Sequence, residues 1–168
     1  AQRAFPLYLK AAFGKADYTI SGTSSYFPET VLEEAGKLDH SIAIGVLKQT
    51  ANLHLDNPDI TGLQKRVDLG GYSSLDSPLT NFQVLSGSLT AAGAVITDRT
   101  AKVWQVKPGD SISFDTERGV KSLPVTAIVK YTSELMGPSS WSMAKYHPWT
   151  VAVPLEAVQD WFGLQDQV

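Results

Sequence analysis

The residue types that most often do chemistry in proteins are present in this sequence, but their spacing forms no recognisable site. The three histidines, His40, His54 and His147, are isolated, and no pair has the i, i+4 spacing of two metal ligands on one helix face. A zinc site needs three or four converging ligands. We therefore expect ordinary surface or loop histidines and no bound metal.

Candidate nucleophiles and acid–base groups are scattered in the same way. The Ser-Gly-Ser run at 86–88 does not reproduce the G-x-S-x-G elbow of a hydrolase, although a serine could still meet a histidine or lysine through folding. Asp98, Asp110 and Asp115 could act as paired carboxylates if they were buried together. A helix cap and a turn explain Asp98 and Asp110 better. No phosphate-binding glycine loop occurs, so we predict no catalytic residue and no cofactor.

The composition describes an ordinary globular chain. Of its 168 residues, 43% are hydrophobic and 18% are charged, which argues against disorder. This length suits one domain, or two small lobes within one chain. The formal net charge of −3 gives no basic patch to hold a phosphate backbone, so no nucleic-acid partner is predicted.

The centre of the chain carries the clearest structural pattern. The apolar run 94–97 suits a buried strand, and a short helix is expected over 98–104 with Asp98 as its cap. Further on, Ile112 and Phe114 alternate with polar residues, as in a strand with one exposed face.

Between these elements, Lys107-Pro108-Gly109-Asp110 predicts a structural turn. Pro108 pre-sets φ at the second position, Gly109 tolerates a positive φ at the third, and Asp110 can bond to the backbone of its own turn.

The N-terminal third predicts one helix and several strand segments. A strand is expected over 17–23, and Pro28 and Gly36 bracket a helix between them. Apolar residues then alternate at even positions from 42 to 46 and at odd positions from 51 to 55. Because the two sets are out of phase, they predict either one strand with a bulge near 47–49 or two separate strands.

The remaining sequence predicts a loop, a hairpin and a closing strand–helix pair. The weakly patterned range 61–81, with its double glycine, predicts a loop with one short helix at most. A turn at 116–119 leads into a strand over 122–131. A strand at 150–153 precedes a helix over 154–163, whose expected buried stripe is Leu155, Val158 and Phe162.

Three segments share their pattern, in this order, with one known family. Residues 15–20 read Lys-Ala-Asp-Tyr-Thr-Ile; the stretch 87–114 follows G-x-L … A-V-I-T … A … V-K-P-G-D-x-I-x-F; and 153–159 follows V-P-L-E-x-x-Q. In these runs the chain resembles the extracytoplasmic domain of MacB/FtsX-type ABC transporter permeases. The likeness touches both ends and the middle of the chain.

The resemblance implies an α+β fold with two lobes. A porter-like strand–helix–strand lobe would combine 16–55 with 149–168, and a mostly β lobe, 56–148, would be inserted between its halves. Residues 1–15 would be a membrane-proximal segment. No Met or signal peptide opens the chain at Ala1, which agrees with a domain lying between two membrane helices.

The resemblance also implies a function without chemistry of its own. The domain would lie on the extracytoplasmic side of the cell membrane and couple ATP-driven movement of the membrane helices to substrate or partner handling outside. Its partners would be the rest of the permease with its nucleotide-binding subunit, a second permease copy, and a peptide or lipid-linked substrate.

Two alternatives from other classes remain open beside this reading. One is a free-standing ligand- or protein-binding β-rich module, or the regulatory domain of another membrane ATPase. The actuator domain of P-type ATPases carries a similar V-x-P-G-D turn, but its T-G-E loop is absent here. The other alternative is a small hydrolase, which would need a nucleophile and a base to converge in the fold.

A long connection near the C-terminal end is rich in large side chains. Its candidate partner-binding residues are Met136, Trp141, Tyr146 and Trp149, because Trp, Tyr and Met are enriched in interface cores. The alternative is that the same residues fill the core of their own domain.

The inserted-domain arrangement makes a geometric prediction. Both chain ends should emerge from one face, because the domain leaves and re-enters the membrane on the same side. Aromatic residues near both ends would then lie close to the membrane surface, where aromatic rings are favoured: Phe5, Tyr8, Phe13, Trp161 and Phe162.

Overall fold

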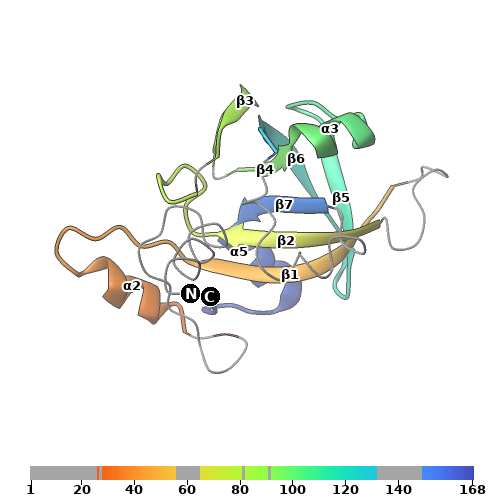
Figure 1. Cartoon of the computed structure of the whole chain (residues 1–168). Coiled ribbons are helices and arrows are strands. Elements are labelled where there is room, and N and C mark those ends of the chain that lie inside the picture. Colours follow the sequence, from red (N-terminus) through yellow and green to blue (C-terminus); the bar gives the residue numbers. More distant parts are fainter. Residues whose placement is uncertain (1–25, 27, 56–64, 81, 91, 132–148) are drawn as a thin grey trace, which may run out of the picture.

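The structure is a computed structural model that describes residues 26, 28–55, 65–80, 82–90, 92–131 and 149–168 (Figure 1). The described helices are α2 (Thr30–Gly36), α3 (Asp98–Trp104) and α5 (Leu155–Phe162). The described strands are β1 (Val46–Leu53), β2 (Arg66–Tyr72), β3 (Val84–Gly87), β4 (Ala94–Thr97), β5 (Ser111–Thr116), β6 (Gly119–Val129) and β7 (Trp149–Pro154). This mixture confirms the predicted α+β class.

The described strands form one seven-stranded sheet in the order β3-β6-β4-β7-β2-β1-β5. Strand β5, the last in this order, also pairs with β6, so every strand except β3 belongs to a closed ring of pairings. The pairs β2–β7 and β4–β6 are parallel, and the other pairs are antiparallel. Closure of this kind satisfies the edges of the strands in the ring.

Strand β6 closes the ring because it is long enough to pair with different neighbours along its length. Its first half, from Gly119 to Pro124, pairs with β5. From Val125 onwards it pairs with β4 on one side and β3 on the other. Pro124, which has no N–H to donate, lies where the partners change.

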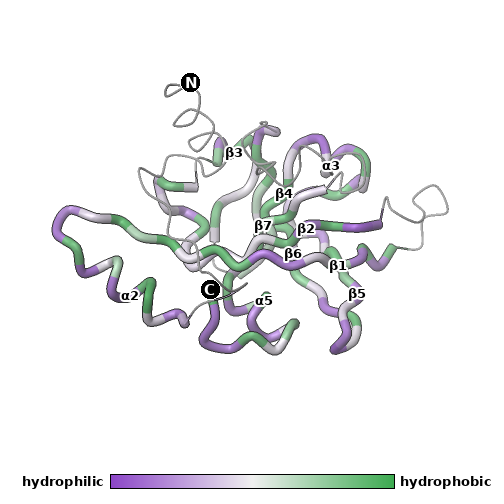
Figure 2. The backbone as a smooth tube through the Cα atoms, turned by 60° about the horizontal axis from the view of Figure 1, so that its bottom comes forward, coloured by the Kyte–Doolittle hydropathy of each residue, from purple (hydrophilic) through white to green (hydrophobic). Residues whose placement is uncertain are grey.

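Apolar side chains cover both faces of the central strands. The main core contains the large rings of Trp104, Phe114, Trp149 and Trp161. A second apolar cluster lies on the opposite face and consists of Leu75, Val95, Ala127, Val129 and Ala152, packed against Tyr72, Phe82 and Leu89. Strand β4 is therefore buried throughout, as the run 94–97 predicts, and Figure 2 shows the hydrophobic residues gathered in the central strands.

Strand β2 contradicts the predicted loop over 61–81. It pairs with β1 on one side and with β7 on the other, so it lies inside the sheet. A Cβ atom at Gly71 would lie 2.8 Å from Cγ2 of Val158 and 3.2 Å from Cα of Leu155. The double glycine therefore marks the place where α5 packs directly on the strand, and a turn is not its role.

Strand β1 also differs from its prediction. It is a single strand with an uninterrupted register against β2, from Val46 to Asn52, and it contains no bulge. Its buried positions are the odd-numbered Leu47, Ala51 and Leu53. The even-numbered alternation begins outside the strand, where Ile42 is 62% exposed in the connection from α2. The apparent change from even to odd positions thus arises because residues 42–45 precede the strand and only the later residues belong to β1.

The ends of the first two described helices differ slightly from those expected. Helix α2 begins at Thr30, and Pro28 instead forms an isolated antiparallel bridge with Gln167. Helix α3 is capped by Thr97, whose hydroxyl accepts the N–H of Thr100 at 3.2 Å. Asp98 is therefore not the cap, because the preceding residue supplies the side-chain oxygen at the extended position that a cap requires.

The last helix ends where the sequence predicts, but one of its three predicted buried residues is not fully buried. Gly163 closes α5 with φ 66°, in the left-handed conformation that a C-cap glycine favours. Leu155 and Val158 are buried as predicted, but Phe162 is only half-buried. Trp161 is the buried aromatic residue, with its ring 5.9 Å from that of Phe114. The Trp161 ring therefore packs in the core, and its distance from the membrane stays a prediction.

The two predicted lobes are not separate sheets in the described part of the chain. Strands β1 and β7 come from the ranges 16–55 and 149–168, and β2 to β6 come from 56–148. All of them share one sheet, in which β2 lies between β1 and β7. The division into two lobes stays a prediction.

Candidate functional site

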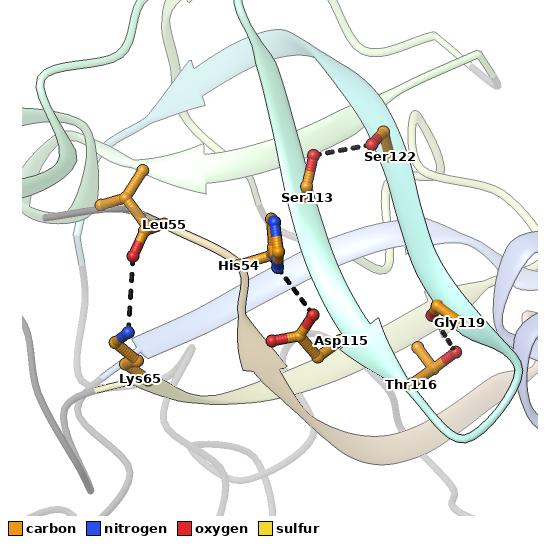
Figure 3. Close-up of polar contacts among 8 residues, drawn as sticks. All are labelled: His54, Leu55, Lys65, Ser113, Asp115, Thr116, Gly119 and Ser122. Carbon is orange, nitrogen blue, oxygen red and sulfur yellow. Dashed lines mark hydrogen bonds and ion pairs between the residues drawn. The ribbon is translucent and has the colours of Figure 1, made fainter.

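The most polar cluster of side chains lies where β1 meets β5 (Figure 3). Nδ1 of His54 is 2.8 Å from Oδ1 of Asp115, and the backbone N–H of His54 donates to the carbonyl oxygen of Ser113 at 2.8 Å. The hydroxyls of Ser113 and Ser122 are 2.6 Å apart across β5 and β6. Antiparallel pairing explains this gathering, because it places Leu53 opposite Phe114 and Ser113 opposite Ser122.

This cluster contains the histidine and the carboxylate of a hydrolase triad, but no described hydrogen bond joins the histidine ring to a serine. A carboxylate that orients a histidine is one half of a catalytic triad, and the other half is a nucleophile bonded to the free ring nitrogen. The described hydrogen bonds join Ser113 to Ser122 and none joins it to the ring of His54. The side chains of His54 and Asp115 are 51% and 49% exposed. A polar contact this exposed contributes about 0–1 kcal/mol, and it links the end of β1 to β5.

A small cavity lies among the described residues. Its volume is about 20 Å³, room for roughly one water molecule. Tyr72, Phe82, Val95 and Val129 are among the residues that line it. Burial raises the pKa of the Tyr72 phenol, so this group stays neutral at ordinary pH. The cavity lies in the second apolar cluster, away from His54.

The predicted turn at 107–110 is confirmed. Gly109 has φ 97°, the N–H of Asp110 donates to the carbonyl oxygen of Lys107 at 3.0 Å, and Oδ2 of Asp110 accepts the N–H of Lys107 at 2.9 Å. The N–H of Gly109 donates to the carbonyl oxygen of Val125. The turn that includes Pro108 thus positions the start of β5 against the middle of β6.

Gly109→Val should lower the free energy of unfolding by about 1–3 kcal/mol, because a β-branched residue is strained at positive φ. No atom lies within 4 Å of the position of an added Cβ, so backbone strain alone would cause the loss. Thermal unfolding measures it, with Gly109→Asn as the control because asparagine tolerates this conformation better. Equal melting temperatures for Gly109→Val and the parent chain would show that φ imposes no strain here.

Of the predicted partner-binding residues, Trp149 alone lies in the described part of the chain. It is 8% exposed in β7, and its ring packs edge-on to that of Trp104 at 5.9 Å. This burial favours the core alternative for Trp149. Met136, Trp141 and Tyr146 lie outside the described residues, and their role stays a prediction.

A polar contact that the sequence pattern did not predict joins the two ends of the described chain. Gln159, buried on α5, donates from Nε2 to Oε2 of Glu29 at 3.0 Å and to the carbonyl oxygen of Gln167 at 2.8 Å. The backbone N–H of Glu29 donates to the carbonyl oxygen of Asp166 at 2.8 Å. We call these contacts the Gln159 clamp. Its one signal in the sequence is the last position of the V-P-L-E-x-x-Q run.

The described residues provide neither a metal-binding cluster nor a membrane-spanning helix. Among them, no group of three or more His, Cys, Asp or Glu side chains could hold a metal ion. Likewise, none of the described helices is long and apolar enough to cross a bilayer.

Comparison with known proteins places the fold. No protein-family model and no curated protein matches the chain. The extracellular domain of YknZ, a noncanonic ABC-type transporter from Gram-positive bacteria, matches with a TM-score of 0.60 and 13% identity, over 90% of this chain and 75% of that one. The periplasmic region of MacB from Actinobacillus actinomycetemcomitans matches with a TM-score of 0.58 and 10% identity, over 84% of this chain and 61% of that one.

These two structures define the class of fold. The chain has the fold of extracytoplasmic domains of MacB- and YknZ-type ABC transporters, which confirms the resemblance seen in its sequence. At such low identity the likeness concerns the fold, and it spans about three-fifths of the MacB region.

Proposed function

We propose that this chain is the extracytoplasmic domain of an ABC transporter permease and that it has no catalytic site of its own. The observation that carries the proposal is the contact between the start and the end of the described chain. Pro28 forms a bridge with Gln167, and the Gln159 clamp fixes Glu29 beside the last residues. A domain inserted between two membrane helices leaves and re-enters the membrane on the same side. The two segments that link it to those helices must therefore lie on one face of the domain.

The clamp also supports a coupling role. Gln159 bonds α5 to two segments, one at Glu29 and one at Gln167, and we expect each segment to lead to a membrane helix. Helix α5 in turn packs on β2, with Val158 against Gly71. A displacement of either connection would therefore be passed to the middle of the sheet. Packed elements transmit such movements because they have low compressibility.

The partners follow from this placement. They are the membrane helices of the same permease, its nucleotide-binding subunit, a second permease copy, and a peptide or lipid-linked substrate. The fold shared with YknZ and MacB domains supports the general role. The division into a porter-like and an inserted lobe, with 1–15 beside the membrane, belongs to the same proposal.

Labelling in intact cells tests the location. The chain has no cysteine, so Glu117→Cys in the exposed β5–β6 turn would give it a single thiol. We expect a membrane-impermeant maleimide to label this variant of the whole protein in intact cells, whereas the parent protein stays unlabelled at this position. Labelling that requires lysis of the cells would overturn the extracytoplasmic location.

A further inference from the structure

Charged residues of opposite sign are separated between two ends of the molecule. Helix α2 and the segment after it carry Glu33, Glu34 and Asp39, and α5 carries Glu156 and Asp160. These acidic groups outnumber the two basic groups beside them, Lys37 and Arg118. Helix α3 lies at the other end in both views (Figures 1 and 2). The net charge of −3 therefore conceals a local surface of the opposite sign.

The outward face of α3 presents that positive surface. Thr100, Ala101 and Trp104 face the core, which leaves Arg99 and Lys102 exposed one turn apart. Lys107 follows the helix closely, since the N–H of Val106 donates to the carbonyl oxygen of Ala101. Lys130 precedes Tyr131, whose N–H donates to Oδ1 of Asp98 at the start of the helix. We call Arg99, Lys102, Lys107 and Lys130 the α3 basic face.

The neighbouring carboxylates do not form ion pairs with these cations. Asp98 accepts the backbone N–H groups of Arg99 and Tyr131, and Asp110 accepts that of Lys107. In the described part of the chain, ion pairs join Lys37 to Glu34 and His54 to Asp115, and none involves the α3 basic face. Among the described residues, no carboxylate is therefore paired with any of these four side chains.

Two further features point to a protein as the source of these carboxylates. The guanidinium carbon of Arg99 lies 5.5 Å from the centre of the Tyr131 ring, which is within the range of a cation–π contact. Val103, one turn after Arg99, is 43% exposed beside Lys102. Arginine and tyrosine around an exposed apolar side chain are typical of protein interfaces.

We propose that the α3 basic face is a docking surface for an acidic segment of a partner protein. Carboxylates of the segment bind Arg99 and Lys102, and an apolar side chain between them covers Val103. The acidic groups at the α2 and α5 end repel such a segment and steer it toward α3. That this face points away from the membrane rests on the proposed function, whereas its binding chemistry does not.

Binding of defined probes to the 168-residue chain tests the proposal. The probe is a short peptide of alternating glutamate and leucine, and its control has glutamine in place of glutamate. We expect NMR shifts of the α3 amides with the acidic peptide alone, and affinity that falls as salt rises. Arg99→Gln with Lys102→Gln should weaken binding about tenfold or more, because charge-assisted contacts are lost.

A matched variant separates a specific face from general charge. Lys48→Gln with Lys121→Gln removes the same charge from strands away from α3 and should leave binding unchanged. Equal weakening by both pairs of substitutions would overturn the proposal. Tighter binding to vesicles of equal parts phosphatidylcholine and phosphatidylglycerol, or to inorganic polyphosphate, would also overturn it in favour of a lipid surface or a phosphate polymer. Failure here would leave the labelling test of location unaffected.

Discussion

Trp149→Ala should lower the free energy of unfolding by about 3–5 kcal/mol, the usual cost of removing a buried tryptophan. Trp149 is 8% exposed in β7, a strand that pairs with both β2 and β4. Its ring meets that of Trp104 at an interplanar angle of 61°, a geometry that adds about 0.5–1.5 kcal/mol beyond burial. Denaturant or thermal unfolding of the purified chain measures the loss.

Two controls show whether the loss comes from the core position. Trp149→Phe keeps an aromatic ring against Trp104 and should cost less than the alanine variant. Val103→Ala removes apolar atoms from a side chain that is 43% exposed and should change stability little. If Trp149→Ala unfolds at the same temperature as the parent chain, Trp149 does not fill the core, and the partner-binding alternative gains support.

Gly71→Val should destabilise the chain by about 1–3 kcal/mol or more, because overpacking a tight contact forces backbone shifts. An added Cβ would lie 2.8 Å from Cγ2 of Val158, and 3.2 Å from Cα of Leu155, which cannot rotate away. Helix α5 would have to lift from β2. We expect a lower melting temperature together with faster hydrogen exchange in α5.

A second glycine provides the control. Gly36 ends α2 with no atom within 4 Å of an added Cβ, so Gly36→Ala should be neutral, or stabilising by about 0.5–1 kcal/mol through helix propensity. If Gly71→Val proved as mild as Gly36→Ala, α5 would not depend on direct contact with β2. The transmission of movement proposed for the Gln159 clamp would then lose its route into the sheet.

Both proposals depend on surfaces that lie at different ends of the domain. The Gln159 clamp joins Glu29 and Gln167 to α5, and α3 lies at the other end of the molecule. The proposed permease domain would be joined to its membrane helices at one end and would bind a partner protein at the other. The labelling test addresses the first of these ends, and the peptide test addresses the second.

Local interactions made part of this protein predictable from its sequence. The turn at 107–110 needs a proline and a glycine in adjacent positions, and both its conformation and its Asp110 contact follow from those residue types. Helix α3 and the cap at Gly163 likewise depend on neighbours within one or two turns of the chain. The order of the three shared segments was enough to indicate the fold that YknZ and MacB domains have.

Contacts between distant segments decided the rest. Gly70-Gly71 has the composition of a turn, and only the close approach of α5 makes it part of a central strand. Gln159 is one polar residue on an amphipathic helix until Glu29 and Gln167 reach it from elsewhere in the chain. The α3 basic face also depends on tertiary structure. The net charge of −3 is a sum over the whole chain, and it does not show that folding brings four basic residues together near α3.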